Sequence, residues 1–281
     1  MSTRLRPLID GLAFPEGPRW HEAKLWFSDM HAHQVIRVGG DGRAEVVVEV
    51  PQQPSGLGWL RDGRLLVVSM VDRRLLRLDP SGLVQVADLS SMASFHCNDM
   101  VVDAHGRAYV GNFGFDLIAQ GPYHAAEIIL VEPDGRARVV ARDMAFPNGT
   151  VITPNGKTLI VGESAAMRLT AFDIGADGSL TNRRVWAEIA PVVPDGICLD
   201  AESCIWVASP TTSEVVRVRQ GGAVADRIPV DTHAYACMLG GADRRTLFVA
   251  TAATHDPETA RRERSGRIET VEVAVPGAGW P

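Results

Sequence analysis

Cysteine is scarce in this chain of 281 residues, and the four that occur, Cys97, Cys198, Cys204 and Cys237, include no Cys-x-x-Cys pair. The spacing of six between Cys198 and Cys204 fits neither a zinc knuckle nor a thiol redox motif. We expect all four thiols to stay reduced and to pack as small apolar groups.

Positive charge and long apolar runs are also missing. The chain has 28 Lys and Arg residues against 34 Asp and Glu residues, a net charge of −6, so nucleic acid is not an expected partner. Apolar runs such as Leu65–Val68 and Ala125–Val131, the second broken by Glu127, are far shorter than the roughly 20 residues that span a membrane. The N-terminal residues Met1–Pro7 hold no apolar signal segment, and we therefore expect a cytoplasmic protein without a membrane partner.

Helical periodicity is nearly absent, and His255–Arg264 is the only stretch that favours a helical turn. The sequence contains no Gly-x-Ser-x-Gly elbow, no Walker A motif and no Gly-x-Gly-x-x-Gly motif. These absences argue against an α/β hydrolase and against nucleotide-binding folds. An all-β architecture is what remains.

One short phrase recurs six times along the chain. A loop leads to a small or polar residue, usually followed by Gly, and then to an apolar stretch; the second residues of the phrase are 17, 56, 99, 149, 196 and, weakly, 237. The repeats are therefore 39 to 50 residues apart. Each period contains about four short strands, such as Leu65–Val68 and the alternating run Arg74–Leu78.

A period of this length with four strands is typical of one β-propeller blade. The sequence therefore predicts a single six-bladed β-propeller domain over residues 1–281. We expect Leu5–Asp10 to form the outer strand of the last blade beside Arg267–Val273, which would close the ring and remove an exposed sheet edge.

In a propeller, the loops that enter the innermost strands gather at one end of the central channel. The first residues of the six phrases are Glu16, Ser55, Asn98, Asn148, Asp195 and Ala236, and four of them carry carboxylate or amide oxygens. Such oxygens suit a divalent cation, and Ca²⁺ fits them best. Mg²⁺ and Mn²⁺ would need a tighter, octahedral arrangement of ligands. Zn²⁺ is less favoured, because none of these positions is a histidine. The alternative interpretation is that Pro-x-Gly is ordinary turn chemistry.

The motifs around these positions resemble the SMP-30/gluconolactonase/luciferin-regenerating enzyme family. The resemblance rests on Phe-Pro-Glu16-Gly, Asn98-Asp99-Met-Val-Val-Asp103, Phe-Pro-Asn148-Gly and Val-Pro-Asp195-Gly, in that order. It implies a six-bladed propeller and a metal-dependent lactonase. It also implies that Glu16, Asn148 and Asp195 bind the metal, that Asp195 is the general base and that Asn98 contacts the substrate.

One position departs from the family pattern. Sugar-lactone hydrolases of the family commonly carry an Arg two residues before the Asn at position 98, and here His96 stands there. A histidine cannot replace the five donors of a guanidinium that grip sugar hydroxyls. Specificity for aldonolactones is therefore in doubt.

The turns between second and third strands should form the pocket wall, with His31, Phe113, Phe115 and Ser164 as substrate contacts. Met70, Tyr123 and Met167 add to a wall that is less polar than a sugar needs. The long loop 112–126 is of a length often found in lids.

The preferred interpretation is a metal-dependent hydrolase of a lactone or ester, a small-molecule substrate, in which the metal polarises the carbonyl and Asp195 activates water. A non-catalytic propeller that binds a small molecule or a cation is the alternative, as is an enzyme of the same fold acting on a non-lactone substrate. The oligomeric state, monomer or dimer, is left open.

Overall fold

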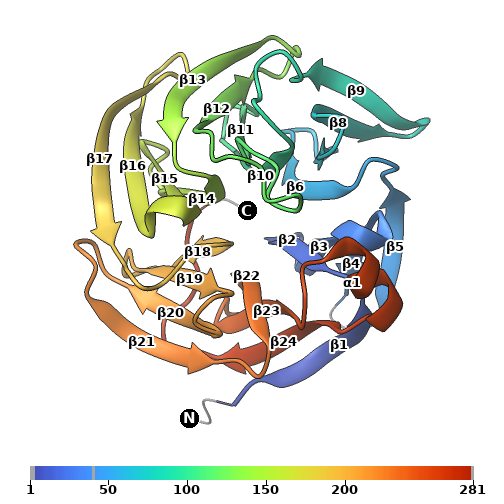
Figure 1. Ribbon diagram of the computed structural model, residues 1–281, viewed down its shortest axis with the longest axis vertical. Helices are drawn as coiled ribbons and strands as arrows, with labels where there is room; N and C mark the ends of the chain where they lie inside the picture. The colour runs from blue at the N-terminus through green and yellow to red at the C-terminus, as the bar shows by residue number, and fades with distance from the viewer. Residues whose placement is uncertain (1–3, 40–41, 280–281) are drawn as a thin grey trace.

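Six four-stranded antiparallel sheets surround a central axis in the computed structural model, which describes residues 4–39 and 42–279 (Figure 1). The predicted all-β, six-bladed propeller is thereby confirmed. The predicted domain of residues 1–281 includes residues 1–3, 40–41 and 280–281, which lie outside the described part.

Each of the first three blades runs from its innermost to its outermost strand in chain order. Their strands are β2 (Pro15–His21), β3 (Lys24–Asp29), β4 (Gln34–Val38) and β5 (Ala44–Glu49); β6 (Pro54–Trp59), β7 (Leu65–Ser69), β8 (Arg74–Asp79) and β9 (Gly82–Asp88); and β10 (Cys97–Val102), β11 (Ala108–Asn112), β12 (Ala126–Val131) and β13 (Ala137–Met144).

The other three blades follow the same order, except that the last one borrows its outer strand from the start of the chain. Their strands are β14 (Pro147–Ile152), β15 (Thr158–Glu163), β16 (Arg168–Ile174) and β17 (Leu180–Glu188); β18 (Ile197–Leu199), β19 (Ile205–Ser209), β20 (Glu214–Val218) and β21 (Val224–Pro229); and β22 (His233–Gly240), β23 (Thr246–Ala252), β24 (Gly266–Glu272) and β1 (Arg6–Leu12).

The ring closes where the sequence predicts. Strand β1 pairs antiparallel with β24, with Arg6 opposite Thr270 and Leu12 opposite Gly266. The observed bounds lie within two residues of the predicted segments, and the pairing covers the edge that β24 would otherwise expose.

The apolar core lies between neighbouring blades. One cluster joins Leu66 and Val68 of the second blade to Met100 and Val110 of the third, and every residue of β12 is buried. Because each sheet packs against a sheet on either side, its inner strands are apolar on both faces rather than alternating.

The repeated glycines are explained by the crowding of the innermost strands near the axis. A Cβ on Gly56 would lie 2.4 Å from the backbone nitrogen of Met100, and one on Gly149 would lie 2.5 Å from that of Ile197. Both contacts are with backbone of the neighbouring blade, which cannot move aside. Turn chemistry alone therefore does not account for the glycines of the repeated phrase.

Three short helices occur in the described residues: η1 (Met30–Ala32), η2 (Ser164–Ala166) and α1 (Pro257–Glu263). The last lies within the predicted helical stretch 255–264, and the Asp256 side chain caps it by accepting a hydrogen bond from Thr259 N at 2.9 Å. Among the described residues, no helix has the length and apolar character needed to span a membrane. The four cysteines are buried and unbridged, as predicted.

After β24 the chain crosses the face where the innermost strands end. Gly277 forms a bridge with Asp200, and Ala278 N donates to the carbonyl of Leu199 at the end of β18, at 2.8 Å. This face is opposite to the one on which the loops enter the innermost strands.

A repeated polar contact holds those loops in place in four blades. The last residue of the second strand accepts a hydrogen bond from a backbone N–H two or three residues before the phrase residue. We call these four acceptors the tie residues: Asp29 (from Ala13 N, 3.0 Å, and Phe14 N, 2.7 Å), Asn112 (from Phe95 N, 3.4 Å), Glu163 (from Ala145 N, 2.6 Å) and Ser209 (from Val193 N, 3.2 Å). The four blades are those whose phrase residue is Glu16, Asn98, Asn148 or Asp195.

We predict that Asp29→Ala lowers the free energy of unfolding by about 3 kcal/mol, because it leaves two buried N–H groups without their charged acceptor. Urea denaturation measures the change. Asp134→Ala is the matched control, since Asp134 also accepts a backbone N–H, from Arg136 at 3.1 Å, but is exposed. Equal effects of the two substitutions would contradict the assigned role of Asp29.

Candidate functional site

A cavity of about 1000 Å³ opens on the face where the loops enter the innermost strands. All nine residues predicted as metal ligands, general base or substrate contacts line it. They are Glu16, Asn98, Asn148 and Asp195 from the repeated phrase, and His31, His96, Phe113, Phe115 and Ser164 from the surrounding loops.

The four phrase residues lie at or just before the starts of innermost strands. Glu16 is the second residue of β2, Asn98 of β10 and Asn148 of β14, while Asp195 precedes β18 by two residues. Asp195 is fixed by its own backbone, because its N–H donates to Ala208 O at 2.9 Å and its carbonyl accepts from Gly149 N at 3.1 Å. Ser55 and Ala236 hold the same repeat position in the other two blades, and both are buried.

The Glu16 and Asp195 side chains are both half-buried at this end of the channel. Burial, followed by the charge of Asp195, raises the pKa of Glu16 well above its usual range. Burial raises the pKa of Asp195 to about 8, with a further contribution from Asp99 and against a hydrogen bond from the Asn148 side chain. These two half-buried carboxyl groups therefore lack sufficient compensating positive charge.

Arg19 carries a positive charge that acts on Glu16, but its side chain is already paired with other groups. The buried Arg19 side chain crosses from the first blade to the third, where it donates to Asp99 Oδ1 and to Met100 O, each at 2.6 Å. Arg19 lowers the pKa of Glu16 only as the last of the causes that act on it. This pair links the first and third blades but leaves the charge of the Glu16 and Asp195 pair largely uncompensated.

The donor set fits a divalent cation that prefers oxygen. Two carboxylates with the amide of Asn148 are the ligand types that Ca²⁺ takes. A bound cation would favour the charged form of both carboxyl groups, against the burial that raises their pKa values. Across residues 4–39 and 42–279, no three His, Cys, Asp or Glu side chains gather as a ligand set. The candidate set thus depends on an amide oxygen in addition to its carboxylates.

Hydrogen bonds with neighbouring hydroxyls orient both amides. Asn148 Nδ2 donates to Ser164 Oγ at 3.3 Å, and Ser164 Oγ donates in turn to Pro194 O at 2.6 Å. Asn98 Oδ1 accepts from Ser55 Oγ at 3.4 Å. Because the Nδ2 of Asn148 points to Ser164, its Oδ1 is available for a ligand.

The upper wall of the cavity is aromatic and aliphatic. Phe113 and Phe115 both pack on Phe146, with ring centroids 4.9 and 5.9 Å apart. Further apolar lining comes from Phe14, Met30, Met70, Val71, Phe95, Leu117, Ile118 and Val193. The expectation of a pocket less polar than a sugar needs is consistent with this lining.

His96 lies in this apolar part of the wall. It is half-buried, and its ring stacks on Phe95 at 4.1 Å. Burial lowers the pKa of His96, so the imidazole is mainly neutral at pH 7. It therefore offers one N–H donor where an arginine would offer several.

The loop between β11 and β12 contributes residues 115–119 to the cavity, and Leu117 and Ile118 there are exposed. Two of the aromatic or sulfur side chains expected on the wall lie elsewhere. Tyr123 and Met167 are not among the lining residues and are 58% and 36% exposed. Tyr123 lies in the second half of the loop, close to β12. Met167 lies between η2 and β16 and has a left-handed backbone conformation.

His31 is buried at the side of the cavity and stacks on Phe14 at 4.8 Å. Its Nε2 donates to the carbonyl of His255 at 3.1 Å, and its Nδ1 is buried without a partner among the described residues. Burial is the main cause that lowers its pKa to about 4. The ring is therefore neutral at pH 7.

Sequence reasoning missed Tyr235 and Phe146. Tyr235 lies at the weakest of the six phrases, and its ring packs on Phe14 at 4.6 Å. Burial, followed by the charges of Asp195 and Glu16, raises its pKa, so the phenol stays protonated beside the two carboxyl groups. Its position one residue before Ala236 was the available signal, and Phe146 likewise precedes the Pro-Asn148 phrase directly.

Comparisons with known proteins agree with this architecture. A 6-deoxy-6-sulfogluconolactonase from Pseudomonas putida is 25% identical over 278 residues, covering 95% of this chain and 93% of that protein. A pentonolactonase from Haloferax volcanii is 24% identical and covers 93% and 91%. A regucalcin from Agrobacterium tumefaciens, described as a calcium-binding protein, has the same fold, with a TM-score of 0.82, 23% identity and coverage of 99% and 96%.

The family model matches most of the chain. The SMP-30/gluconolactonase/LRE-like region matches residues 14–253, which include every phrase residue and all four tie residues. The chain therefore belongs to the SMP-30/gluconolactonase/LRE-like family.

Proposed function

We propose that this protein is a metal-dependent hydrolase of a lactone or ester. The observation that carries the proposal is the pair of half-buried carboxyl groups, Glu16 and Asp195, beside Asn148 in a cavity with a largely aromatic and aliphatic wall. Two relatives across the length of this chain are named as lactonases, which supports the same reaction class.

Glu16, Asn148 and Asp195 would hold the cation, for which Ca²⁺ fits the oxygen donors best and Mg²⁺, Mn²⁺ and Zn²⁺ are the alternatives. When bound, a divalent cation supplies Lewis acidity to the substrate carbonyl and compensates the two carboxylates. The remaining chemistry belongs to side chains of this chain.

Asp195 would accept the proton of the attacking water, since it lies at the cavity floor and is fixed by its backbone contacts. Asn98 and the neutral His96 line the same cavity and carry N–H groups that could donate to the oxyanion. Hydrolysis then adds water across the acyl C–O bond, and a lactone yields one hydroxy acid.

The apolar wall supports a substrate with little hydroxylation. Phe113, Phe115 and Phe146 offer surface to a hydrocarbon part, whereas a sugar lactone would leave several hydroxyls facing them unpaired. The loop that carries Leu117 and Ile118 is proposed to cover such a substrate.

We predict that Ca²⁺ stabilises the wild-type fold, since the site exists only when three blades are assembled. At 100 times the dissociation constant the gain is about 2.7 kcal/mol. Differential scanning calorimetry with Ca²⁺ and with EDTA measures it, and Glu16→Gln should reduce the response. An unchanged melting curve in EDTA, with no metal by elemental analysis, would contradict the metal site.

A second prediction concerns the base. Asp195→Asn keeps an oxygen ligand, so it should retain metal binding while hydrolysis falls by a factor of about 10² or more. Activity on the best substrate from a lactone and aryl-ester panel is the readout, and Asp134→Asn is the exposed control. If the metal-loaded Asp195→Asn protein turns over at the wild-type rate, Asp195 is a metal ligand only and not the general base. A panel that is inert with metal-loaded wild type would favour the non-catalytic alternative.

The third prediction concerns substrate choice. For lactones of one ring size with growing alkyl chains, kcat/KM should rise about fourfold per added CH₂, the equivalent of about 0.8 kcal/mol, until the cavity is full. The kcat/KM for gluconolactone should be lower than that for the simple alkyl lactones. His96→Arg should reduce this difference in kcat/KM. A clear wild-type preference for gluconolactone would show that His96 does not weaken recognition of sugar hydroxyls.

A further inference from the structure

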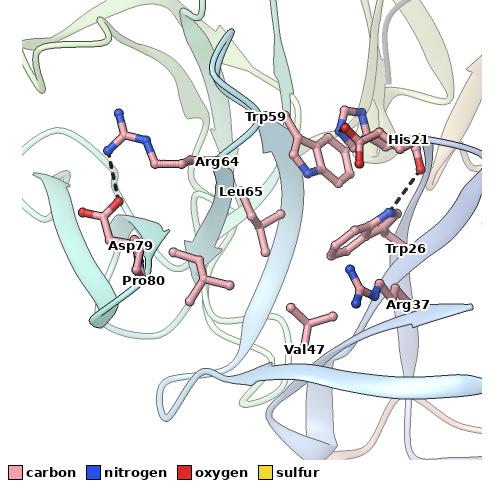
Figure 2. Close-up of a pocket in the computed structure, with 12 residues that line it drawn as sticks. His21, Trp26, Arg37, Val47, Trp59, Arg64, Leu65, Asp79 and Pro80 are labelled. Atoms are coloured by element: carbon pink, nitrogen blue, oxygen red, sulfur yellow. Dashed lines mark hydrogen bonds and ion pairs between the residues drawn. The ribbon is translucent and has the colours of Figure 1, made fainter.

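A second cavity, of about 450 Å³, lies between the first and second blades at the opposite end of their strands from the candidate site. His21 and Trp59 are the last residues of β2 and β6, whereas Glu16 lies at the start of β2. The two cavities share no lining residue in the described part of the chain. We call this second cavity the crevice; Figure 2 shows the side chains around it.

The body of the crevice is apolar and aromatic. Trp26 and Trp59 meet edge to face, with ring centroids 5.4 Å apart, and His21 stacks on Trp59 at 4.0 Å. Val47, Leu65 and Leu78 complete the apolar lining. The Trp26 indole N–H is already used, because it donates to His21 O at 3.3 Å.

The charged groups on the second-blade side satisfy one another. Arg64 donates to Asp62 at 2.6 Å and to Asp79 at 3.1 Å, and Asp79 also accepts from Arg77 at 2.7 Å. Figure 2 shows Arg64 and Asp79 bound together on the side of the crevice facing away from Trp26 and Arg37. This network adds little net charge and few free donors.

Arg37, on the first-blade side, is different. Its guanidinium lies over the Trp26 ring, 5.3 Å from the centroid, and Nη2 pairs with Glu45. Its Nε is buried and has no hydrogen-bond partner among the described residues. A buried donor left unpaired is unfavourable. A small movement of the Arg37 side chain that brings this N–H to an acceptor in the crevice is therefore favoured.

We propose that the crevice binds a small, uncharged ring compound that carries one hydrogen-bond acceptor, such as a carbonyl oxygen. The ring would occupy the apolar space beside Trp26, Leu65 and Val47, and its oxygen would accept the Nε–H of Arg37. The volume suits a molecule of one or two rings and is too small for a folded peptide.

Charge selects the uncharged member of this class. Glu45 already neutralises Arg37, and Asp62 and Asp79 neutralise Arg64. The Glu22 carboxylate is a further lining group. A ligand carboxylate would therefore be repelled by these carboxylates, with no unpaired positive charge to offset the repulsion. A neutral carbonyl can accept the hydrogen bond from Arg37 Nε–H without that repulsion.

Benzamide is the probe, and benzoate is its charged counterpart of the same shape. We expect benzamide to shift the indole N–H signals of Trp26 and Trp59 in two-dimensional NMR, with a dissociation constant of about 1 mM, as expected for a ligand of this size. Trp26→Phe and Trp59→Phe assign the signals. The described lining of the larger cavity contains no tryptophan, so these signals report on the crevice.

Arg37→Lys keeps the positive charge but removes the Nε–H, and it should weaken benzamide binding at least fivefold. Val47→Phe fills the crevice and should abolish binding independently of Arg37. Arg136→Ala is the control, since Arg136 is exposed, pairs with Asp134 and lies in the turn between β12 and β13 of the third blade, away from the crevice lining. It should leave binding unchanged.

Three results would overturn the proposal. They are no shift of either indole signal at 10 mM benzamide, equal affinity in wild type and Arg37→Lys, and benzoate binding more tightly than benzamide. Because the readout is binding far from Asp195, each result is independent of whether the larger cavity hydrolyses lactones.

Discussion

The candidate site depends on one repeated constraint, the hydrogen bond from a loop N–H to the tie residue at the end of the second strand. Each tie fixes a loop two or three residues before a functional side chain. The blades use a carboxylate, an amide, a second carboxylate and a hydroxyl for this purpose. The contact is thus defined by its position in the blade. Any side chain at that position can make it if its oxygen is close enough to accept the hydrogen bond from the loop N–H.

The energetic importance of the ties follows from the charges that they organise. Glu16 and Asp195 come from blades one and five, so no single sheet holds them at a fixed separation. Their mutual repulsion favours moving the loops apart, and Arg19 below them is bound to Asp99. Anchored loops keep the pair together, which is the preorganisation that a cation site or a catalytic base requires.

Much of this arrangement could be predicted from the sequence, because a propeller converts repeat position into spatial position. The phrase at Glu16, Asn98, Asn148 and Asp195 predicts one end of the channel, and those residues line one cavity. The path of the long loop 112–126 was harder to predict, because it depends on packing with Phe146 rather than on the repeat. Tyr123 was therefore expected on the wall but is largely exposed. The tie residues and Tyr235 were missed because their contacts cross between strands or blades, and no local pattern records them.

The pairing of β1 with β24 sets an order on how the ring can form. Thr270 donates to the carbonyl of Arg6, a residue 264 positions earlier in the chain. During synthesis, β1 leaves the ribosome first and has no partner until nearly all the other strands have followed. Through that interval β1 is an unpaired strand, which can join the edge of another molecule. Closure of the ring thus has to wait for β24, and nascent chains held at high local concentration are the ones most exposed to exchange of β1 between neighbours.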